Sequence, residues 1–259
     1  MANTYAANFG DVVKHSVLCE VVVRERPPRY LESHGGRLVY DLAGLTPGPG
    51  GVWDFLEVAS DDDDLNRSIY AELIRRDAGT RHNPGKYPGS IALAAERLPA
   101  ESDVLAFELV PASATELAEG LAAMGRSATV EVADGLTGVC ERARPGDLVL
   151  LDPFHVHVRG EAFSSVEAFA MLATRGVSTM LWYAIYDPSE PDEWIADSIP
   201  SPVPRGWSAR LVGDATEGGL AGCGFLTAHL CSESEAAAGA IIEALARALS
   251  PVRRGLRVE

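Results

Sequence analysis

The chain has 259 residues, 47% of them hydrophobic, and a formal net charge of −15 at pH 7. This length suits one large α/β domain or two small ones, and the apolar fraction is ample for a buried core. A surface this acidic repels phosphate backbones. The overall charge therefore cannot drive nucleic-acid binding, which would need a local basic patch.

Membrane insertion and secretion are also disfavoured by the sequence. No run of 18 apolar residues is present, so we expect no membrane-spanning segment. The residues from Met1 to Tyr5 lack the basic and apolar blocks of a signal peptide, and we therefore expect a cytoplasmic protein. The four cysteines have no spacing typical of zinc or redox sites, and we expect them to be reduced and buried.

The first hundred residues show helical patterns separated by turn signals. Val13, Val17 and Val21 share one face of the first helix, which Pro27-Pro28 ends. The helices of this part are predicted over 9–24, 53–80 and 91–97. Residues 46–90 begin with a Pro/Gly-rich loop and follow the first strand, so we interpret them as a small helical insertion within the domain.

From residue 104 onwards, strands and helices alternate. Two helices are expected to open at capping-box sequences, Ser113–Glu116 and Ser232–Glu235, and a third helix precedes Pro145. The predicted strands of the whole chain are 29–33, 104–108, 129–132, 148–151, 177–183, 210–212 and 224–230. Repeated strand–helix units predict an α/β fold with a mostly parallel seven-stranded sheet and helices on both faces.

The segment Asp152-Pro153-Phe154-His155 directly follows the apolar strand at 148–151. In open α/β sheets, ligands bind beyond the carboxyl ends of the strands. An acid followed by proline and an aromatic residue at that place is similar to the Asp-Pro-Pro-Tyr motif of amino-group methyltransferases. In that motif the carboxylate accepts a hydrogen bond from an exocyclic amine and aims its lone pair at a methyl donor. The alternative interpretation is an ordinary Asp-Pro turn at the end of a strand.

Three further strand ends carry residues suited to a nucleoside cofactor. The turn His34-Gly35-Gly36 follows the first strand and would let the backbone approach a ligand. Glu108 ends the second predicted strand, where an acid suits ribose hydroxyls. Asp134-Gly135 follows the next strand and suits an adenine amino group. Together with Asp152, these positions predict a cofactor lying across the strand ends.

At this level of detail the chain resembles the RlmJ family. These bacterial enzymes use S-adenosylmethionine (SAM) to methylate an adenine N6 in 23S ribosomal RNA. The resemblance extends from about Tyr5 to Leu230, and its most specific parts are Asp-Val-Val-Lys-His and Tyr-Pro-Gly-Ser. The matching segments are 8–15, 31–36, 40–42, 87–90, Glu108, 133–135, 151–153 and 181–183. The resemblance implies a Rossmann-like SAM-dependent methyltransferase fold, forming a single methyltransferase domain over residues 1–259.

The resemblance also implies roles for individual residues. Asp152 would be the catalytic acceptor for the amine and would lie against the cofactor. The other cofactor contacts would be His15, His34, Gly36, Ser90, Glu108, Asp134 and Gly135. On the substrate side would lie Lys14, Pro153, Phe154 and His155. No metal is needed for this chemistry.

The chain departs from the family pattern in ways that leave the substrate open. Phe154 and His155 replace a second proline and a tyrosine, and Leu38 stands where the family often has another glycine. One hypothesis is an RNA adenine-N6 methyltransferase, for which the candidate basic cluster is Arg75, Arg76, Arg81, His82 and Lys86. The second is a small-molecule N-methyltransferase, which the altered motif and the acidic charge favour. The third is a non-catalytic cofactor-binding or RNA-binding protein, against which the retained Asp152 counts.

Overall fold

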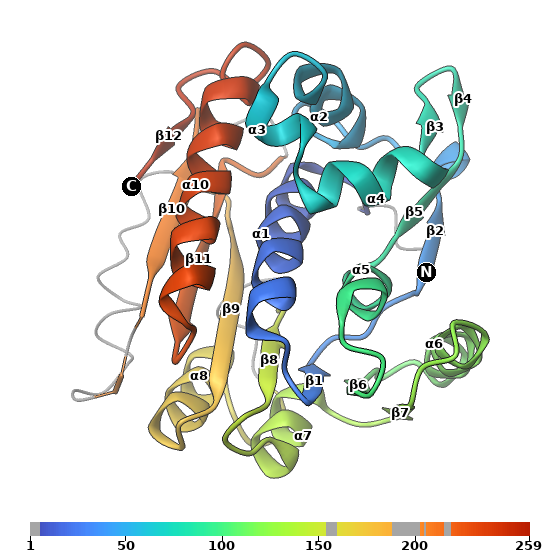
Figure 1. Cartoon of the computed structure of the whole chain (residues 1–259), viewed down its shortest axis with the longest axis vertical. Coiled ribbons are helices and arrows are strands. Elements are labelled where there is room, and N and C mark those ends of the chain that lie inside the picture. Colours follow the sequence, from blue (N-terminus) through green and yellow to red (C-terminus); the bar gives the residue numbers. More distant parts are fainter. Residues whose placement is uncertain (1–5, 154–159, 188–202, 205, 215–218) are drawn as a thin grey trace.

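A computed structural model describes residues 6–153, 160–187, 203–204, 206–214 and 219–259. Its centre is an eight-stranded sheet with the order β12-β10-β11-β9-β8-β1-β6-β7 (Figure 1). The strands are β1 (Arg29–Glu32), β6 (Asp103–Phe107), β7 (Ala128–Glu131), β8 (Leu148–Leu151), β9 (Ser178–Ile185), β10 (Ser208–Val212), β11 (Gly222–Ala228) and β12 (Arg257–Val258). Strands β7, β6, β1, β8 and β9 are parallel, whereas β11 runs antiparallel to both of its neighbours. The predicted α/β fold and mostly parallel sheet are confirmed, and the two-residue β12 adds an eighth strand to the seven expected.

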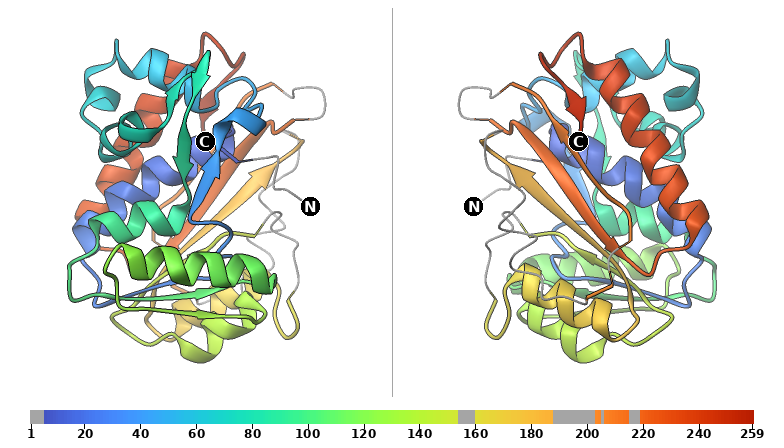
Figure 2. Two further views of the ribbon diagram at one scale, coloured as in Figure 1. Left: turned by 90° about the vertical axis from the view of Figure 1, so that its right-hand side faces the viewer. Right: turned by 90° about the vertical axis from the view of Figure 1, so that its left-hand side faces the viewer.

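Helices cover both faces of this sheet (Figures 1 and 2). The helices are α1 (Phe9–Glu25), α2 (Val52–Ala59), α3 (Asp63–Asn66), α4 (Ile69–Asp77), α5 (Ser90–Arg97), α6 (Pro111–Ala123), α7 (Gly135–Arg142), α8 (Ser165–Thr174), α10 (Ser232–Leu249) and the short 3-10 helix η1 (Leu42–Gly44). One hydrophobic core joins α1, α2, α4, α5, α6 and α10 to one face. A second core packs α7 and α8 on the opposite face. Within the described residues, no helix combines the length and the apolar character needed to span a membrane.

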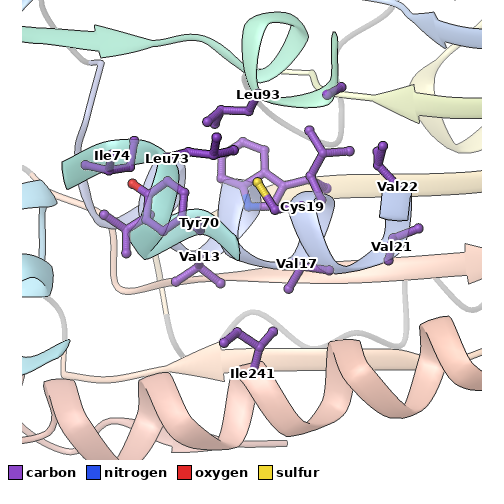
Figure 3. Close-up of a cluster of buried hydrophobic side chains, with 14 of the residues drawn as sticks. Val13, Val17, Cys19, Val21, Val22, Tyr70, Leu73, Ile74, Leu93 and Ile241 are labelled. Atoms are coloured by element: carbon purple, nitrogen blue, oxygen red, sulfur yellow. The ribbon is translucent and has the colours of Figure 1, made fainter. Parts of the chain in front are cut away.

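Helix α1 is buried along most of its length and lies at the centre of the larger core. Val13 and Val17 lie among Tyr70 of α4, Leu93 of α5 and Ile241 of α10 (Figure 3). Burying such side chains stabilises the fold by about 1.5–3 kcal/mol each. The predicted valine stripe is therefore confirmed as core. Because α1 is surrounded by other elements on nearly all sides, the polar residues Lys14 and His15 of its first turns are also buried.

Two of the expected helix starts were wrong in detail. Helix α6 begins at Pro111 without a side-chain cap, because proline at the first helical position presets the backbone and starts the helix ahead of Ser113. Helix α10 begins after Cys231, and its Glu235 instead accepts the backbone N–H of Trp207 at 2.8 Å. The chain does contain a capping box, formed by Ser164 and Glu167 at the start of α8.

The segment 46–90 is only partly helical. The single helical stretch expected over 53–80 is divided into α2, α3 and α4, because the side chains of Asp62 and Ser68 cap backbone N–H groups and start new helices. Three short strands follow, β3 (Gly79–Thr80), β4 (Asn83–Pro84) and β5 (Lys86–Pro88), and β5 pairs with β2 (Val39–Asp41). The segment contributes Phe55 and Tyr70 to the main core, so it packs against the sheet domain.

Candidate active site

A cavity of about 640 Å³ opens beyond the carboxyl ends of β1, β8 and β9, beside the first turns of α1. It brings together residues that are far apart in the sequence. Of the side chains and glycines predicted for the site, the cavity is lined by Lys14, His15, His34, Gly36, Ser90, Glu108 and Asp152. The carboxyl ends of parallel strands meet at one edge of a sheet, which is why strand-end residues converge there.

Asp152 forms a buried ion pair at this cavity. Its Oδ2 lies 2.6 Å from Lys14 Nζ, which also lies 3.1 Å from Oδ1 of Asp11. The side chains of Asp11, Lys14 and Asp152 are 17%, 8% and 12% exposed. Burial raises the pKa of Asp152 to about 6, although the Lys14 ammonium opposes this. Burial alone would lower the pKa of Lys14, but Asp152 and Asp11 raise it above its ordinary value, so the pair is ionised at neutral pH.

The position of Asp152 is fixed through the neighbouring strand end. Its backbone N–H donates to Ser33 Oγ at 3.2 Å, and the same hydroxyl lies 2.8 Å from Nδ1 of His34. The N–H of Ser33 in turn donates to Leu150 O at 3.1 Å, which continues the pairing of β1 with β8. Burial, and next the charge of Lys14, lower the pKa of His34 to about 4, although Asp134 opposes this, so its ring is neutral at pH 7.

Glu108 and the glycine turn form another wall. Glu108 Oε2 accepts the N–H of Gly36 at 2.9 Å, and Oε1 accepts the N–H of Val110 at 2.8 Å. Gly36 has a φ of +59°, and a Cβ there would lie 2.8 Å from the Tyr40 hydroxyl. The positive φ is the reason that glycine is favoured at this position. Each carboxylate oxygen of Glu108 retains acceptor capacity beyond its backbone bond.

His15 is held by a chain of buried hydroxyl groups. Its Nδ1 lies 2.8 Å from the Tyr87 hydroxyl, which lies 2.9 Å from the hydroxyl of Tyr70. Burial, and next the charge of Lys14, lower the pKa of His15 to about 3, so this ring is also neutral at pH 7. The structure thus places a fixed, uncharged imidazole against the cavity.

Glu32 is a buried acid beneath the cavity that the sequence interpretation missed. It accepts hydrogen bonds from the Ser90 hydroxyl, which lines the cavity, and from the Tyr30 hydroxyl at 2.6 Å. Burial, and next the charge of Asp152, raise the pKa of Glu32 to about 8. The sequence feature that could have indicated Glu32 is an acid at the end of the short strand β1, two residues after the buried Tyr30.

Three of the predicted residues that the structure describes do not line the cavity. Asp134 caps α7 by accepting the N–H of Thr137 at 2.8 Å, and Gly135 packs tightly against the backbone of Ser33. Pro153 is buried but is absent from the cavity wall. Phe154 and His155 lie outside the described residues. The cofactor role of Asp134 and Gly135 and the substrate role of the other three stay predictions.

The cavity is also lined by Trp182, Phe9 and Arg253, which the sequence interpretation did not single out as ligand contacts. Lys14 Nζ lies 5.0 Å from the ring centroid of Trp182. The buried Arg253 guanidinium lies 4.0 Å from the Phe9 centroid and donates to Pro49 O at 3.1 Å. The aromatic run Leu181-Trp182-Tyr183 was the available signal for Trp182, whereas Arg253 comes from the far end of the chain.

The candidate basic cluster for RNA is largely engaged by the protein itself. Arg76 binds Glu96 through both terminal nitrogens, with Nη1 to Oε2 at 2.7 Å. Arg81 pairs with Asp54 at 2.7 Å, and Arg75 donates to the backbone carbonyl of Asn66. The charges of two of the three arginines in this cluster, Arg76 and Arg81, are therefore paired with carboxylates of the protein.

No protein-family model and no curated protein sequence matches the chain. Among solved structures, protein LPL1258 from Legionella pneumophila, of family model DUF519, matches with 22% identity and a TM-score of 0.78 over 98% of both chains. An rRNA methylase from Streptococcus thermophilus aligns over 84% of this chain and 95% of its own, with 12% identity and a TM-score of 0.43. The O-methyltransferase TomG from Streptomyces achromogenes, in complex with SAM, covers 83% of this chain and 79% of its own, at 13% identity and a TM-score of 0.45. The chain therefore has the fold of LPL1258 over nearly its whole length, a mixed α/β fold with a mostly parallel sheet.

Proposed function

We propose that the protein is a SAM-dependent N-methyltransferase. The observation that carries the proposal is the buried Lys14–Asp152 ion pair at a cavity shared with Glu108 and the Gly35-Gly36 turn. An ionised carboxylate at the end of a central strand, next to a cradle for a nucleoside, is the arrangement that the Asp-Pro motif predicts. A neutral or inaccessible Asp152 would have removed the basis for this chemistry.

The residues of the cavity fit SAM as the cofactor. Three carboxylates line the cavity, those of Asp11, Glu108 and Asp152, against the two cations Lys14 and Arg253. This balance favours a ligand that carries positive charge. Gly36 lines the cavity in a left-handed backbone conformation, and a glycine turn lets a ligand approach the backbone. When bound, SAM supplies an activated methyl group on a sulfonium.

Asp152 would act on the nitrogen that receives the methyl group. Its carboxylate accepts a hydrogen bond from the amine, which raises electron density on the nitrogen and orients the lone pair. Lys14 keeps this carboxylate ionised, and Ser33 fixes its backbone. Most of the acceleration would come from holding the nucleophile in line with the methyl group at near-attack distance. The transfer leaves a positive charge on the nitrogen, and this cation loses its proton easily because it is acidic.

For the acceptor, we propose the exocyclic N6 of adenine in ribosomal RNA, as the RlmJ-like segments imply. A second candidate is a small-molecule amine on the same scaffold. It is favoured by the internal pairing of Arg76 and Arg81, which weakens the basic cluster that RNA would need. The two acceptors differ in their response to salt, because binding of a phosphate backbone weakens steeply as salt rises and binding of a small amine does not.

The proposal is tested in two steps. Isothermal titration should first detect SAM binding, and a chain that binds no SAM would contradict the whole proposal. Transfer of labelled methyl groups is then measured into unmodified 23S rRNA fragments and, in parallel, into a metabolite extract. Label in RNA that decreases with salt supports the first acceptor, and label only in the extract supports the second. SAM binding without label in either would favour a non-catalytic cofactor-binding protein.

A further inference from the structure

Asp11 is a cavity carboxylate to which the sequence interpretation gave no role. It lies in the first turn of α1, where the Asn8 side chain accepts its backbone N–H at 3.0 Å. Its Oδ1 lies 3.1 Å from Lys14 Nζ, three residues further along the helix. The same ammonium lies 2.6 Å from Asp152 Oδ2. Lys14 is thus shared between two carboxylates, one from its own helix and one from the end of β8.

We propose that Asp11 is a positioning residue that divides the charge of Lys14 between two carboxylates and thereby sets how basic Asp152 is. This inference rests on the proposed methyl transfer, because Asp152 is the carboxylate that would accept the amine. If Lys14 served Asp152 alone, the carboxylate would be stabilised more strongly and would be a weaker acceptor. Asp11 withdraws part of that stabilisation and also adds a like charge beside Asp152.

Burial makes this division of charge effective. An exposed pair three residues apart on a helix contributes little, because water and salt screen it. Here the three side chains are at most 17% exposed, so their charges act on one another in a medium of lower dielectric. The direction agrees with the effect of Asp11 on the pKa of Asp152, which is to raise it.

Other titratable groups adjoin Asp152, but the two nearest imidazoles are neutral at pH 7. Burial is the first cause of the lowered pKa of both His15 and His34. Within the part of the chain that the structure describes, the neighbouring charged or titratable groups are Asp11, Lys14 and His15 from α1, Glu32 and His34 from β1 and its turn, Glu108 after β6, Arg253, and the tyrosines Tyr30, Tyr40 and Tyr87. Among the described residues, Lys14 is the side chain that bonds directly to the Asp152 carboxylate, so a change at its second partner acts on Asp152 first.

The test is a pH titration of the Asp152 carboxyl carbon by NMR, in protein labelled with ¹³C at aspartate carboxyl groups. Asp11→Asn removes the charge at nearly constant shape, and Asp11→Glu retains it. Asp77→Asn is the matched control, since it removes one exposed carboxylate away from the cavity. We expect the Asp152 midpoint to fall by about one pH unit in Asp11→Asn and to stay near the wild-type value in the other two. The kcat for methyl transfer, measured at saturating SAM, should fall roughly threefold in Asp11→Asn.

An Asp152 midpoint that does not move in Asp11→Asn, or that moves equally in Asp77→Asn, would overturn the inference. Should Asp11→Asn not fold, Asp11→Ser provides the same loss of charge with a residue tolerated near a helix start. The NMR titration needs no substrate. Failure of the wild-type chain to transfer methyl groups would therefore count against the proposed function, whereas the midpoints would still decide whether Asp11 divides the charge of Lys14.

Discussion

The Lys14–Asp152 pair at the cavity and the Arg76–Glu96 pair at the surface join similar charges in different surroundings. Lys14 and Asp152 are 8% and 12% exposed, whereas Arg76 and Glu96 are 47% and 31% exposed. The cavity pair links α1 to the end of β8, and the pKa of its acid is raised to about 6 by burial. The surface pair links α4 to α5 with two hydrogen bonds.

This contrast shows that an ion pair can have two unrelated consequences. At the surface, water screens both charges, so the pair contributes little to stability. Its main consequence is to cancel positive charge on this part of the surface. In the cavity, desolvation makes the charge of Asp152 depend on its partner, and removing Lys14 would leave this carboxylate buried and unbalanced. The cavity pair is therefore where substitutions should have large effects.

The largest effect is expected for Asp152→Asn. Asparagine keeps the shape of the side chain but is a weaker acceptor for the amine, and we expect kcat to fall about a hundredfold or more. SAM binding should persist, because Asp11 still balances Lys14 and the fold is retained. Single-turnover methyl transfer and isothermal titration measure the two quantities separately. Wild-type turnover in Asp152→Asn would refute the proposed role of this carboxylate.

The pH dependence of methyl transfer should follow the ionisation of Asp152. Its pKa is raised to about 6, and the ionised form is the acceptor, so activity should be constant above that pH. Below it, kcat should decrease about tenfold for each pH unit as the carboxylate is protonated. Lys14 remains charged across this range. A pH–rate profile that is flat between pH 4 and 8 would show that Asp152 does not limit the reaction.

The sequence predicted which strand ends would carry the site but not the direction of every side chain. Asp152, Glu108 and the turn after β1 converge because the parallel strands β8, β6 and β1 end at the same edge. Asp134 follows β7 in the same way, yet its side chain caps α7, since Thr137 lies three residues on and offers its N–H. The Asp134 carboxylate could bind a ligand or cap the helix. The spacing of residues along the chain does not show which of these hydrogen bonds forms.

Long-range partners were the least predictable part of the site. Lys14 and Asp152 are 138 residues apart, and no local pattern indicates that they pair. The Arg75 to Lys86 cluster was predicted as a basic patch because the sequence displays its charges but not the acids opposite them. Asp54 and Glu96, which neutralise two of its arginines, come from α2 and α5. Only the packing of these helices around α4 brings them together.

Glu32 differs from both pairs, because it is a buried acid whose hydrogen bonds come from hydroxyl groups and not from a cation. Its pKa is raised to about 8 from an ordinary value of 4.5, first by burial and next by Asp152. Between these pH values the folded state binds more protons than the unfolded state, so the free energy of unfolding should fall as pH rises. The slope approaches about 1.4 kcal/mol per pH unit for one group. Glu32→Gln cannot titrate, and urea unfolding from pH 5 to 8 should show this slope removed.

A smaller effect is expected at Asp134, the strand-end acid that caps α7 and is not among the residues lining the described cavity. Asp134→Ala removes the cap of α7 and should lower the free energy of unfolding by about 1 kcal/mol. Asp134→Asn keeps a capping oxygen and should cost much less. The same pair of variants tests the predicted cofactor contact by isothermal titration. A weaker SAM affinity in both variants would support that contact. An affinity unchanged in both would show that Asp134 acts as a helix cap and does not contact the cofactor.

The smallest effect is expected for the surface pair itself. Removing either partner, in Arg76→Ala or Glu96→Ala, should change the free energy of unfolding by no more than about 0.5 kcal/mol, because both groups are well solvated. A double-mutant cycle by urea unfolding isolates their coupling, which should stay below about 1 kcal/mol. Glu96→Ala also exposes an unbalanced Arg76 on the candidate RNA surface. If RNA is bound there, its affinity should increase and become more sensitive to salt, whereas a small-molecule enzyme would be indifferent to the change.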